Sequence, residues 1–277
     1  MRLLIAVLLL AAAPAAGEPL PSAGCARTAI DRGRRLERTI DVVGTPRQVI
    51  LDVPEAVRAG VPAPVLLDFH GFGHSGAGVW EVSGFRALAE REGFITAYPQ
   101  GLPVTLHLRG QDLTNAGWQV DVVAGNRDLA FTAALLDQIE RDYCVDRRRL
   151  YATGFSNGAW FSQLLACAMA DRIAAVAPVS GGTLRVDCQP SRPVSILIQH
   201  GSADDLVPVA ADREVRDRWR ALNGCPADAQ ADGATCQRWS ACRADSVVAY
   251  CEEPYAHRWP PQGSERVWAF LSSKRLP

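Results

Sequence analysis

Apolar runs alternate along this chain with segments in which apolar residues recur every three or four positions. Two early runs, RQVILDV at residues 47–53 and APVLLDFH at residues 63–70, predict strands, and the second is apolar enough for the buried centre of a sheet. FRALAEREG at residues 85–93 predicts a helix that ends at its last glycine, and FITAYP at residues 94–99 predicts the next strand. Strand and helix therefore alternate from early in the chain.

The second half of the chain continues this alternation. Apolar residues spaced by three or four positions between residues 128 and 143 predict an amphipathic helix. The segments that follow predict a strand, a helix, two strands and a helix, in the order RRLYATGF, NGAWFSQLLACAMA, IAAVAPVSG, PVSILIQHG and DREVRDRWRALNG. This order predicts an α/β fold with a mostly parallel central sheet and helices on both faces.

Two stretches depart from the pattern. Residues 100–126 have weak periodicity and many turn residues, and we expect a long loop there of the kind that often carries function. Residues 224–263 are rich in cysteine and poor in apolar periodicity.

The first residues are typical of an export signal. An apolar run at residues 3–13 is followed by small residues, so we expect residues 1–17 to be a signal peptide and residues 18–277 to form a single catalytic domain. A membrane anchor is disfavoured because a span needs about 20 apolar residues. A lipoprotein cysteine at Cys25 is a weaker alternative, since no leucine stands three positions before it.

Charge and cysteine content indicate which partners and cross-links to expect. The 30 acidic and 29 basic residues nearly cancel, so we expect neither a nucleic-acid partner nor a membrane partner, and we expect a monomer. An even set of eight cysteines behind an export signal predicts disulfides, four of them stapling residues 225–251. Zinc is disfavoured because these four are irregularly spaced and no C-x-x-C occurs.

The candidate nucleophile is Ser156, in the motif Gly154-Phe155-Ser156-Asn157-Gly158. The motif alone is weak, but here it lies between a predicted strand and a predicted helix, which is the context of a nucleophile elbow. Glycines flank the serine because side chains at 154 or 158 would collide with neighbouring backbone. The N–H of Asn157, at the start of the helix, is placed to stabilise an oxyanion.

A serine nucleophile needs a base, and a carboxylate must orient that base. In the order Ser, acid, His that this fold uses, His257 is the base, because it leaves room for an acid after a buried strand. Asp204 is the favoured acid and Asp205 the alternative. His200 is expected to be structural, holding the acid loop by a side-chain hydrogen bond.

The second oxyanion donor is expected from the glycine-rich loop HGFGHSG that follows the strand at residues 63–70. Phe72 N–H is the first choice and Gly71 N–H the second. His70 and His74 are four positions apart, but the glycines between them oppose the helix that a metal pair would need. We therefore expect no metal, and triad chemistry needs no cofactor.

Several motifs resemble one known family in the same order along the chain. They include FHGFGHSG, YPQGL, DLAFTAALLDQIERDYCVDRRRLYATGFSNG, AVAPVSGG, IQHGSADDLVPV and the late cysteines ending in YCEE and AHRWP. Together they resemble the secreted feruloyl esterases and poly(3-hydroxybutyrate) depolymerase-like hydrolases of carbohydrate esterase family 1. The resemblance implies the α/β-hydrolase fold and a triad of Ser156, Asp204 and His257. Asn157 and Ala159 depart from the tyrosine and glycine often found at the elbow, which affects the expected substrate more than the chemistry.

The expected activity is hydrolysis of a small-molecule or polysaccharide-linked ester, most simply a feruloyl ester of plant cell-wall polysaccharide. Trp118, Trp160 and Trp259 are candidate walls for its aromatic acyl group, although ordinary packing is the alternative for each. A polyhydroxybutyrate or short-chain polyester depolymerase is the alternative activity. It is disfavoured because such enzymes commonly carry a binding module on a linker, which is not evident after His257. A catalytically inactive binding protein on the same fold is disfavoured by the ordered triad.

Overall fold

The computed structural model describes residues 17–108, 110–184 and 186–277, so residues 1–16 of the expected signal peptide lie outside the described part. A ten-stranded sheet runs through the domain in the order β1-β2-β4-β3-β7-β8-β9-β12-β11-β10. The strands are β1 (Gly33–Val42), β2 (Thr45–Val53), β3 (Ala63–Phe69), β4 (Ile95–Pro99), β7 (Val145–Phe155), β8 (Ala175–Val179), β9 (Ser195–Gly201), β10 (Gln230–Ala231), β11 (Cys236–Trp239) and β12 (Val248–Glu253).

The centre of the sheet is parallel. Neighbouring strands pair in parallel from β4 through β3, β7, β8 and β9 to β12, while β1, β2, β10 and β11 join the two margins in antiparallel pairs. Parallel strands of an open sheet end at one edge, where α/β proteins place their sites. The predicted mostly parallel α/β sheet is therefore confirmed.

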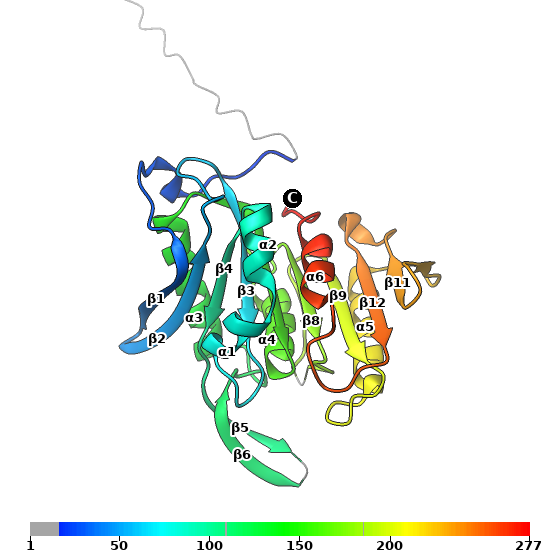
Figure 1. Cartoon of the computed structure of the whole chain (residues 1–277). Helices are drawn as coiled ribbons and strands as arrows, with labels where there is room; N and C mark the ends of the chain where they lie inside the picture. The colour runs from blue at the N-terminus through cyan, green and yellow to red at the C-terminus, as the bar shows by residue number, and fades with distance from the viewer. Residues whose placement is uncertain (1–16, 109, 185) are drawn as a thin grey trace, which may run out of the picture.

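Helices cover both faces of this sheet (Figure 1). They are α1 (Gly76–Val82), α2 (Phe85–Glu92), α3 (Arg127–Asp142), α4 (Asn157–Ala168), α5 (Val209–Asn223) and α6 (Gly263–Leu271), with short 3-10 turns at Ala23–Ala26 and Arg243–Asp245. Successive residues of β3 show how the two layers form. Leu67 and Phe69 join the apolar cluster with α3, α4 and α5, whereas Leu66 joins the cluster with α2 and α6. Strands buried on both faces explain the nearly continuous apolar runs of the sequence.

The loop expected over residues 100–126 is in part a hairpin, so that expectation is wrong in part. β5 (Leu102–Leu108) pairs in antiparallel register with β6 (Gln111–Gly117), and the pair projects below the sheet in Figure 1. Every second residue of β5 is partly buried and the residues between are exposed. This alternation of apolar and polar residues was the available signal, but the polar sequence of β6 hid its partner.

The cysteine-rich stretch is folded more regularly than its sequence suggests. It supplies β11 and also β12, which belongs to the parallel centre of the sheet. All eight cysteines are paired, and the prediction of disulfides is confirmed, in the pairs Cys25–Cys144, Cys167–Cys188, Cys225–Cys242 and Cys236–Cys251. Two of these bridges lie within residues 225–251, as expected. Within the described residues, none of the helices has the length and apolar character that a membrane span requires.

Candidate active site

Ser156 occupies a sharp turn between β7 and α4. Its backbone lies at φ 55° and ψ −116°, a conformation that residues other than glycine rarely adopt. A Cβ atom at Gly158 would come within 2.0 Å of the Phe69 carbonyl oxygen, and one at Gly154 within 2.6 Å of the Gly158 backbone. Both flanking positions therefore require glycine, and Ser156 lies in the strand-turn-helix arrangement expected of a nucleophile elbow.

His257 and Asp204 meet at the carboxyl edge of the sheet. Asp204 follows β9 and His257 follows the neighbouring parallel strand β12, so their loops leave the sheet at the same edge. His257 Nδ1 lies 2.7 Å from Asp204 Oδ2, and the His257 ring lies 4.6 Å from the Phe155 ring, centre to centre. Asp204 rather than Asp205 thus contacts the imidazole, and the ring packs against the residue that precedes Ser156.

The buried Asp204 carboxylate is held in its charged form. Its Oδ1 accepts hydrogen bonds from Leu206 N–H at 3.0 Å and from Val207 N–H at 2.9 Å. Burial raises the pKa of Asp204, but the hydrogen bonds from Val207 and His257 lower it by more. The pKa therefore lies below its ordinary value. A carboxylate that accepts the Nδ1 hydrogen leaves the lone pair on Nε2, which is the tautomer that a general base needs.

His200 lies beneath this acid loop. Its Nε2 is 2.9 Å from the Val207 carbonyl oxygen, and its Nδ1 is 2.5 Å from Asp212 Oδ2. Burial lowers the pKa of His200, but the hydrogen bond and charge of Asp212 raise it more, so the pKa lies above its ordinary value. The predicted side-chain hydrogen bond from His200 to the acid loop is present, and its structural role stays a prediction.

Two backbone segments meet beside Ser156. Asn157 is the first residue of α4, where an N–H group has no acceptor within the helix. Phe72 lies in the loop after β3, which passes so close that a Cβ atom at Gly71 would be 3.5 Å from Ser156 Cβ. The predicted oxyanion donors, Phe72 and Asn157, therefore belong to two segments that meet at the turn containing Ser156.

The side chain of Asn157 has a contact that the sequence did not predict. Its Oδ1 accepts a hydrogen bond from Trp118 N–H at 2.7 Å, and its Nδ2 lies 3.2 Å from the Trp118 carbonyl oxygen. Trp118 directly follows β6, so these two hydrogen bonds join the hairpin to the nucleophile turn. No pattern in the sequence signals such a pairing between distant residues.

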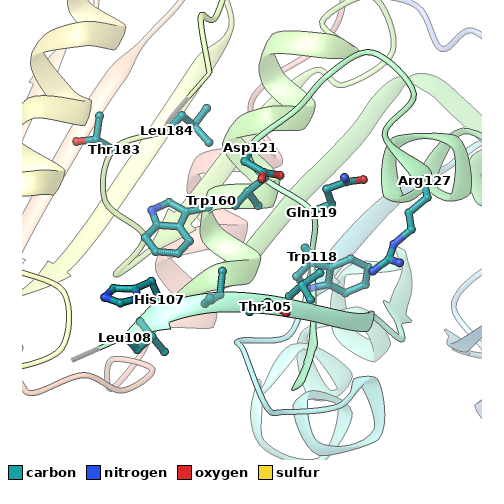
Figure 2. Close-up of a pocket in the computed structure, with 13 residues that line it drawn as sticks. Thr105, His107, Leu108, Trp118, Gln119, Asp121, Arg127, Trp160, Thr183 and Leu184 are labelled. Atoms are coloured by element: carbon teal, nitrogen blue, oxygen red, sulfur yellow. The ribbon is translucent and has the colours of Figure 1, made fainter. Parts of the chain in front are cut away.

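A cavity of about 310 Å³ lies between the hairpin and the first turns of α4. Figure 2 shows Trp160 of α4 facing β5, with Thr183 and Leu184 on one side and Trp118 and Arg127 on the other. Apolar side chains of β5 complete one wall, namely Val104, Leu106 and Leu108. The cavity thus combines aliphatic and aromatic walls with a few polar groups, as ligand sites usually do.

The three tryptophans predicted as substrate walls lie in different environments. Trp160 is partly exposed in the cavity, whereas Trp118 lines it from a fully buried position and donates its Nε1–H to the His70 carbonyl at 2.8 Å. Trp259 packs edge-on against Phe85 of α2, with ring centres 6.0 Å apart, and is not among the residues that line this cavity. The structure therefore brings Trp118 and Trp160 together and leaves Trp259 apart.

Curated proteins that are similar in sequence are named as esterases. Feruloyl esterase D from Neurospora crassa is 29% identical over 230 residues, which cover 79% of this chain and 74% of that protein. A probable feruloyl esterase C from Aspergillus terreus is 30% identical over 185 residues, or 65% of this chain and 63% of the relative. A bifunctional acetylxylan esterase/xylanase from Neocallimastix patriciarum is 25% identical over 220 residues; they cover 76% of this chain and only 31% of that protein.

Solved structures show the same fold. An acetyl xylan esterase from Aspergillus awamori aligns with a TM-score of 0.67 at 16% identity, over 86% of this chain and 99% of that structure. A thermostable esterase aligns with a TM-score of 0.60 at 18% identity, over 88% of this chain and 64% of that structure. No protein-family model matches the chain. The predicted α/β-hydrolase fold is confirmed, and so is the resemblance to feruloyl esterases, which are carboxylic ester hydrolases.

Proposed function

From its similarity to feruloyl esterases, we propose that this α/β-hydrolase is a secreted serine esterase acting on feruloyl or related hydroxycinnamoyl esters of plant cell-wall polysaccharide. Ser156 is the nucleophile, His257 the general base and acid, and Asp204 the residue that orients His257. The N–H groups of Phe72 and Asn157 bind the oxyanion.

The reaction needs only the groups of this site and a water molecule. Ser156 Oγ attacks the ester carbonyl carbon while His257 Nε2 takes its proton, and the carbonyl oxygen becomes an oxyanion that accepts two N–H hydrogen bonds. Collapse of this intermediate expels the alcohol, which takes the proton from His257. Water then attacks the acyl-Ser156 ester in the same way, releasing the acid and returning a proton to Ser156.

The observation that carries this proposal is the hydrogen bond of 2.7 Å between His257 Nδ1 and Asp204 Oδ2, beside a serine at φ 55°. The rare backbone conformation of Ser156, between two positions that require glycine, costs conformational free energy. Such strain is found mainly at functional sites, which supports a role for the hydroxyl. His257 is the base that a serine hydroxyl requires, and the ionised Asp204 carboxylate orients it.

The substrate class is supported by the relatives and by the chemistry of the cavity beside α4, although Ser156, Asp204 and His257 are not among the residues that line it. A hydroxycinnamoyl group is flat and mostly apolar with a polar phenolic end, which suits the aliphatic side chains of β5 and the ring of Trp160. Three relatives are named for feruloyl or acetylxylan ester hydrolysis. These names support an ester of the plant cell wall.

Secretion is supported by the apolar run at residues 3–13 and by the four disulfides. Disulfides persist in oxidising compartments outside the cytosol. Recovery of the protein from the medium or periplasm, with a new N-terminus near Gly17, is the expected result when it is expressed with its own leader.

The nucleophile is tested by Ser156→Ala. We expect turnover of a chromogenic acyl ester to fall by a factor on the order of 10⁶ with the fold unchanged, since only a small hydroxyl is removed. His257→Ala should lose a similar amount and Asp204→Asn less. More than a tenth of the wild-type rate in Ser156→Ala would overturn the assignment.

The substrate is tested by comparing methyl ferulate with hydroxybutyrate oligomers. We expect the larger kcat/KM for methyl ferulate. A tenfold preference for the oligomers, or about 1.4 kcal/mol of differential transition-state binding, would favour a depolymerase with the same triad.

A further inference from the structure

His70, the residue directly after β3, is fully buried, and both of its ring nitrogens contact backbone groups. Nδ1 lies 2.7 Å from the Gly71 carbonyl oxygen, and Nε2 accepts a hydrogen bond from Gly101 N–H at 2.9 Å. Because Gly101 N–H only donates, Nε2 must carry the lone pair and Nδ1 must carry the hydrogen that it donates to Gly71. The surroundings therefore select one tautomer of the ring.

The same surroundings keep the ring neutral and fixed in place. Burial lowers the pKa of His70 to about 4, and the hydrogen bond to Gly71 opposes this only in part. Trp118 donates its Nε1–H to the His70 carbonyl at 2.8 Å, and the two rings lie 5.0 Å apart, centre to centre. His70 is thus a rigid, uncharged donor of a single hydrogen bond at Nδ1.

The peptide that accepts this hydrogen bond also carries the Phe72 N–H. In a planar trans peptide the C=O of Gly71 and the N–H of Phe72 point in opposite directions. The Gly71 carbonyl is turned toward the buried His70 ring and also accepts from His74 N–H at 3.1 Å. The Phe72 N–H therefore points away from the His70 ring, in the loop that passes beside Ser156.

We infer that His70 is a positioning residue whose Nδ1–H fixes the Gly71–Phe72 peptide with its N–H toward the oxyanion that forms at Ser156. The inference rests on the proposed function, since it concerns the transition state of that reaction. His70 itself touches no reacting atom. If the peptide flipped, the Gly71 carbonyl oxygen would face the oxyanion and repel it instead of stabilising it.

The rest of the loop has hydrogen bonds of its own, although Gln100, which holds one of them, also contacts His70 Nε2 through its Nε2 at 3.4 Å. Gly73 N–H donates to the Ala116 carbonyl at 2.8 Å, which ties the loop to the hairpin. Gly76 N–H donates to Gln100 Oε1 at 3.1 Å at the start of α1. Loss of the His70 donor should therefore loosen the Gly71–Phe72 peptide, which keeps the hydrogen bond from His74 N–H, rather than unfold the loop.

Two substitutions separate the two ring nitrogens. His70→Asn places an amide nitrogen near the position of Nδ1, which keeps a donor for Gly71. His70→Gln places an amide oxygen near the position of Nε2, which keeps an acceptor for Gly101. The Gly71 carbonyl then loses the shorter hydrogen bond from His70 and keeps the longer one from His74 N–H. Both remove a buried ring, and asparagine is one methylene smaller than glutamine. Loss of packing alone would therefore make His70→Asn the more damaging change, which is the opposite of the order expected here.

We expect kcat for methyl ferulate to fall by a factor on the order of 10² in His70→Gln, with KM within about threefold, and to stay within about tenfold in His70→Asn. The affinity for a trifluoromethyl ketone, which forms a tetrahedral oxyanion on the serine, should fall with kcat. Equal losses of kcat in the two variants, or losses that only follow their melting temperatures, would overturn the inference.

If neither variant unfolds cooperatively, ¹⁵N NMR of histidine-labelled wild-type protein decides the question. Nδ1 of His70 is expected to carry the hydrogen at neutral pH, and a hydrogen on Nε2 would overturn the inference. The proposed function fails separately, because it falls if Ser156→Ala remains active, whatever the His70 variants do.

Discussion

The two sides of the site are held together by different means. The elbow side, residues 69–73 and 154–158, depends on backbone segments that touch where side chains are absent, and on buried hydrogen bonds such as those of His70. The acid–base side, residues 201–207 and 251–257, follows two neighbouring strands whose outer margin carries the Cys236–Cys251 disulfide. On the elbow side, Gly154 and Gly158 have no room for a side chain, whereas the acid–base side is constrained by a disulfide that can be removed.

This difference follows from where each side lies in the fold. The elbow side is at the centre of the sheet, where β3 and β7 have neighbours on both sides and helices on both faces. The acid–base side lies toward the margin, where only β11 and β10 stand beyond β12. The central position is rigid mainly because it is closely packed, although α4 is also cross-linked by Cys167–Cys188. The marginal position has fewer neighbouring strands and depends more on its cross-link.

The largest effect is expected for Gly158→Ala on the elbow side. The added Cβ would lie 2.0 Å from the Phe69 carbonyl oxygen, and backbone atoms on both sides cannot move apart cheaply. We expect the free energy of unfolding to fall by more than about 4 kcal/mol, with loss of activity in proportion, as measured by urea titration. The matched control is Gly78→Ala in α1, where the nearest atom is the Ser75 Oγ at 3.4 Å and a change within about 1 kcal/mol is expected. Equal stability of the two variants would contradict the packing account.

A smaller effect is expected when the Cys236–Cys251 bridge is replaced by alanines on the acid–base side. The free energy of unfolding should fall by about 2 to 4 kcal/mol, because the bridge restricts the unfolded chain. At low temperature kcat should be nearly unchanged, since backbone hydrogen bonds between β11 and β12 remain.

Titration of the denatured, unreduced wild-type protein should find no free thiol, and four or more reactive thiols would refute the disulfides.

The smallest effect concerns Asp68 of β3, next to the elbow side. Burial raises the pKa of Asp68 to about 7, whereas in the unfolded chain it is near 4. Between pH 6 and pH 8 the unfolded chain holds no proton on this group while the folded protein loses one, so stability falls as pH rises, by about 1.4 kcal/mol. Asp68→Asn should remove this part of the slope in urea titrations at the two pH values. An unchanged slope would show that Asp68 is ionised throughout.

The sequence was informative where local chemistry decides the structure. The glycines around Ser156 and the apolar runs of β3 and β9 reflect constraints of their own segments, and they led to the fold and to the nucleophile turn. The sequence favoured Asp204 but left Asp205 open, because only the meeting of two loops shows which carboxylate contacts His257.

Contacts between distant segments were the part that could not be predicted. The hydrogen bonds from Trp118 N–H to Asn157 Oδ1 and from Gly101 N–H to His70 Nε2 join residues that no periodicity links. The pairing of β5 with β6 was missed for a related reason, since most of β6 is exposed and polar and so shows no apolar pattern. Tertiary contacts, rather than local preference, determine these features.

The central claim, that Ser156 is the nucleophile activated by His257, is tested most directly by covalent labelling. A fluorophosphonate ester reacts with an activated serine and releases fluoride, and the adduct is located by peptide mass spectrometry. The account predicts one adduct per chain, on Ser156, with no labelling of Ser156→Ala and labelling slowed by orders of magnitude in His257→Ala. An adduct on another residue, or undiminished labelling of Ser156→Ala, would contradict it.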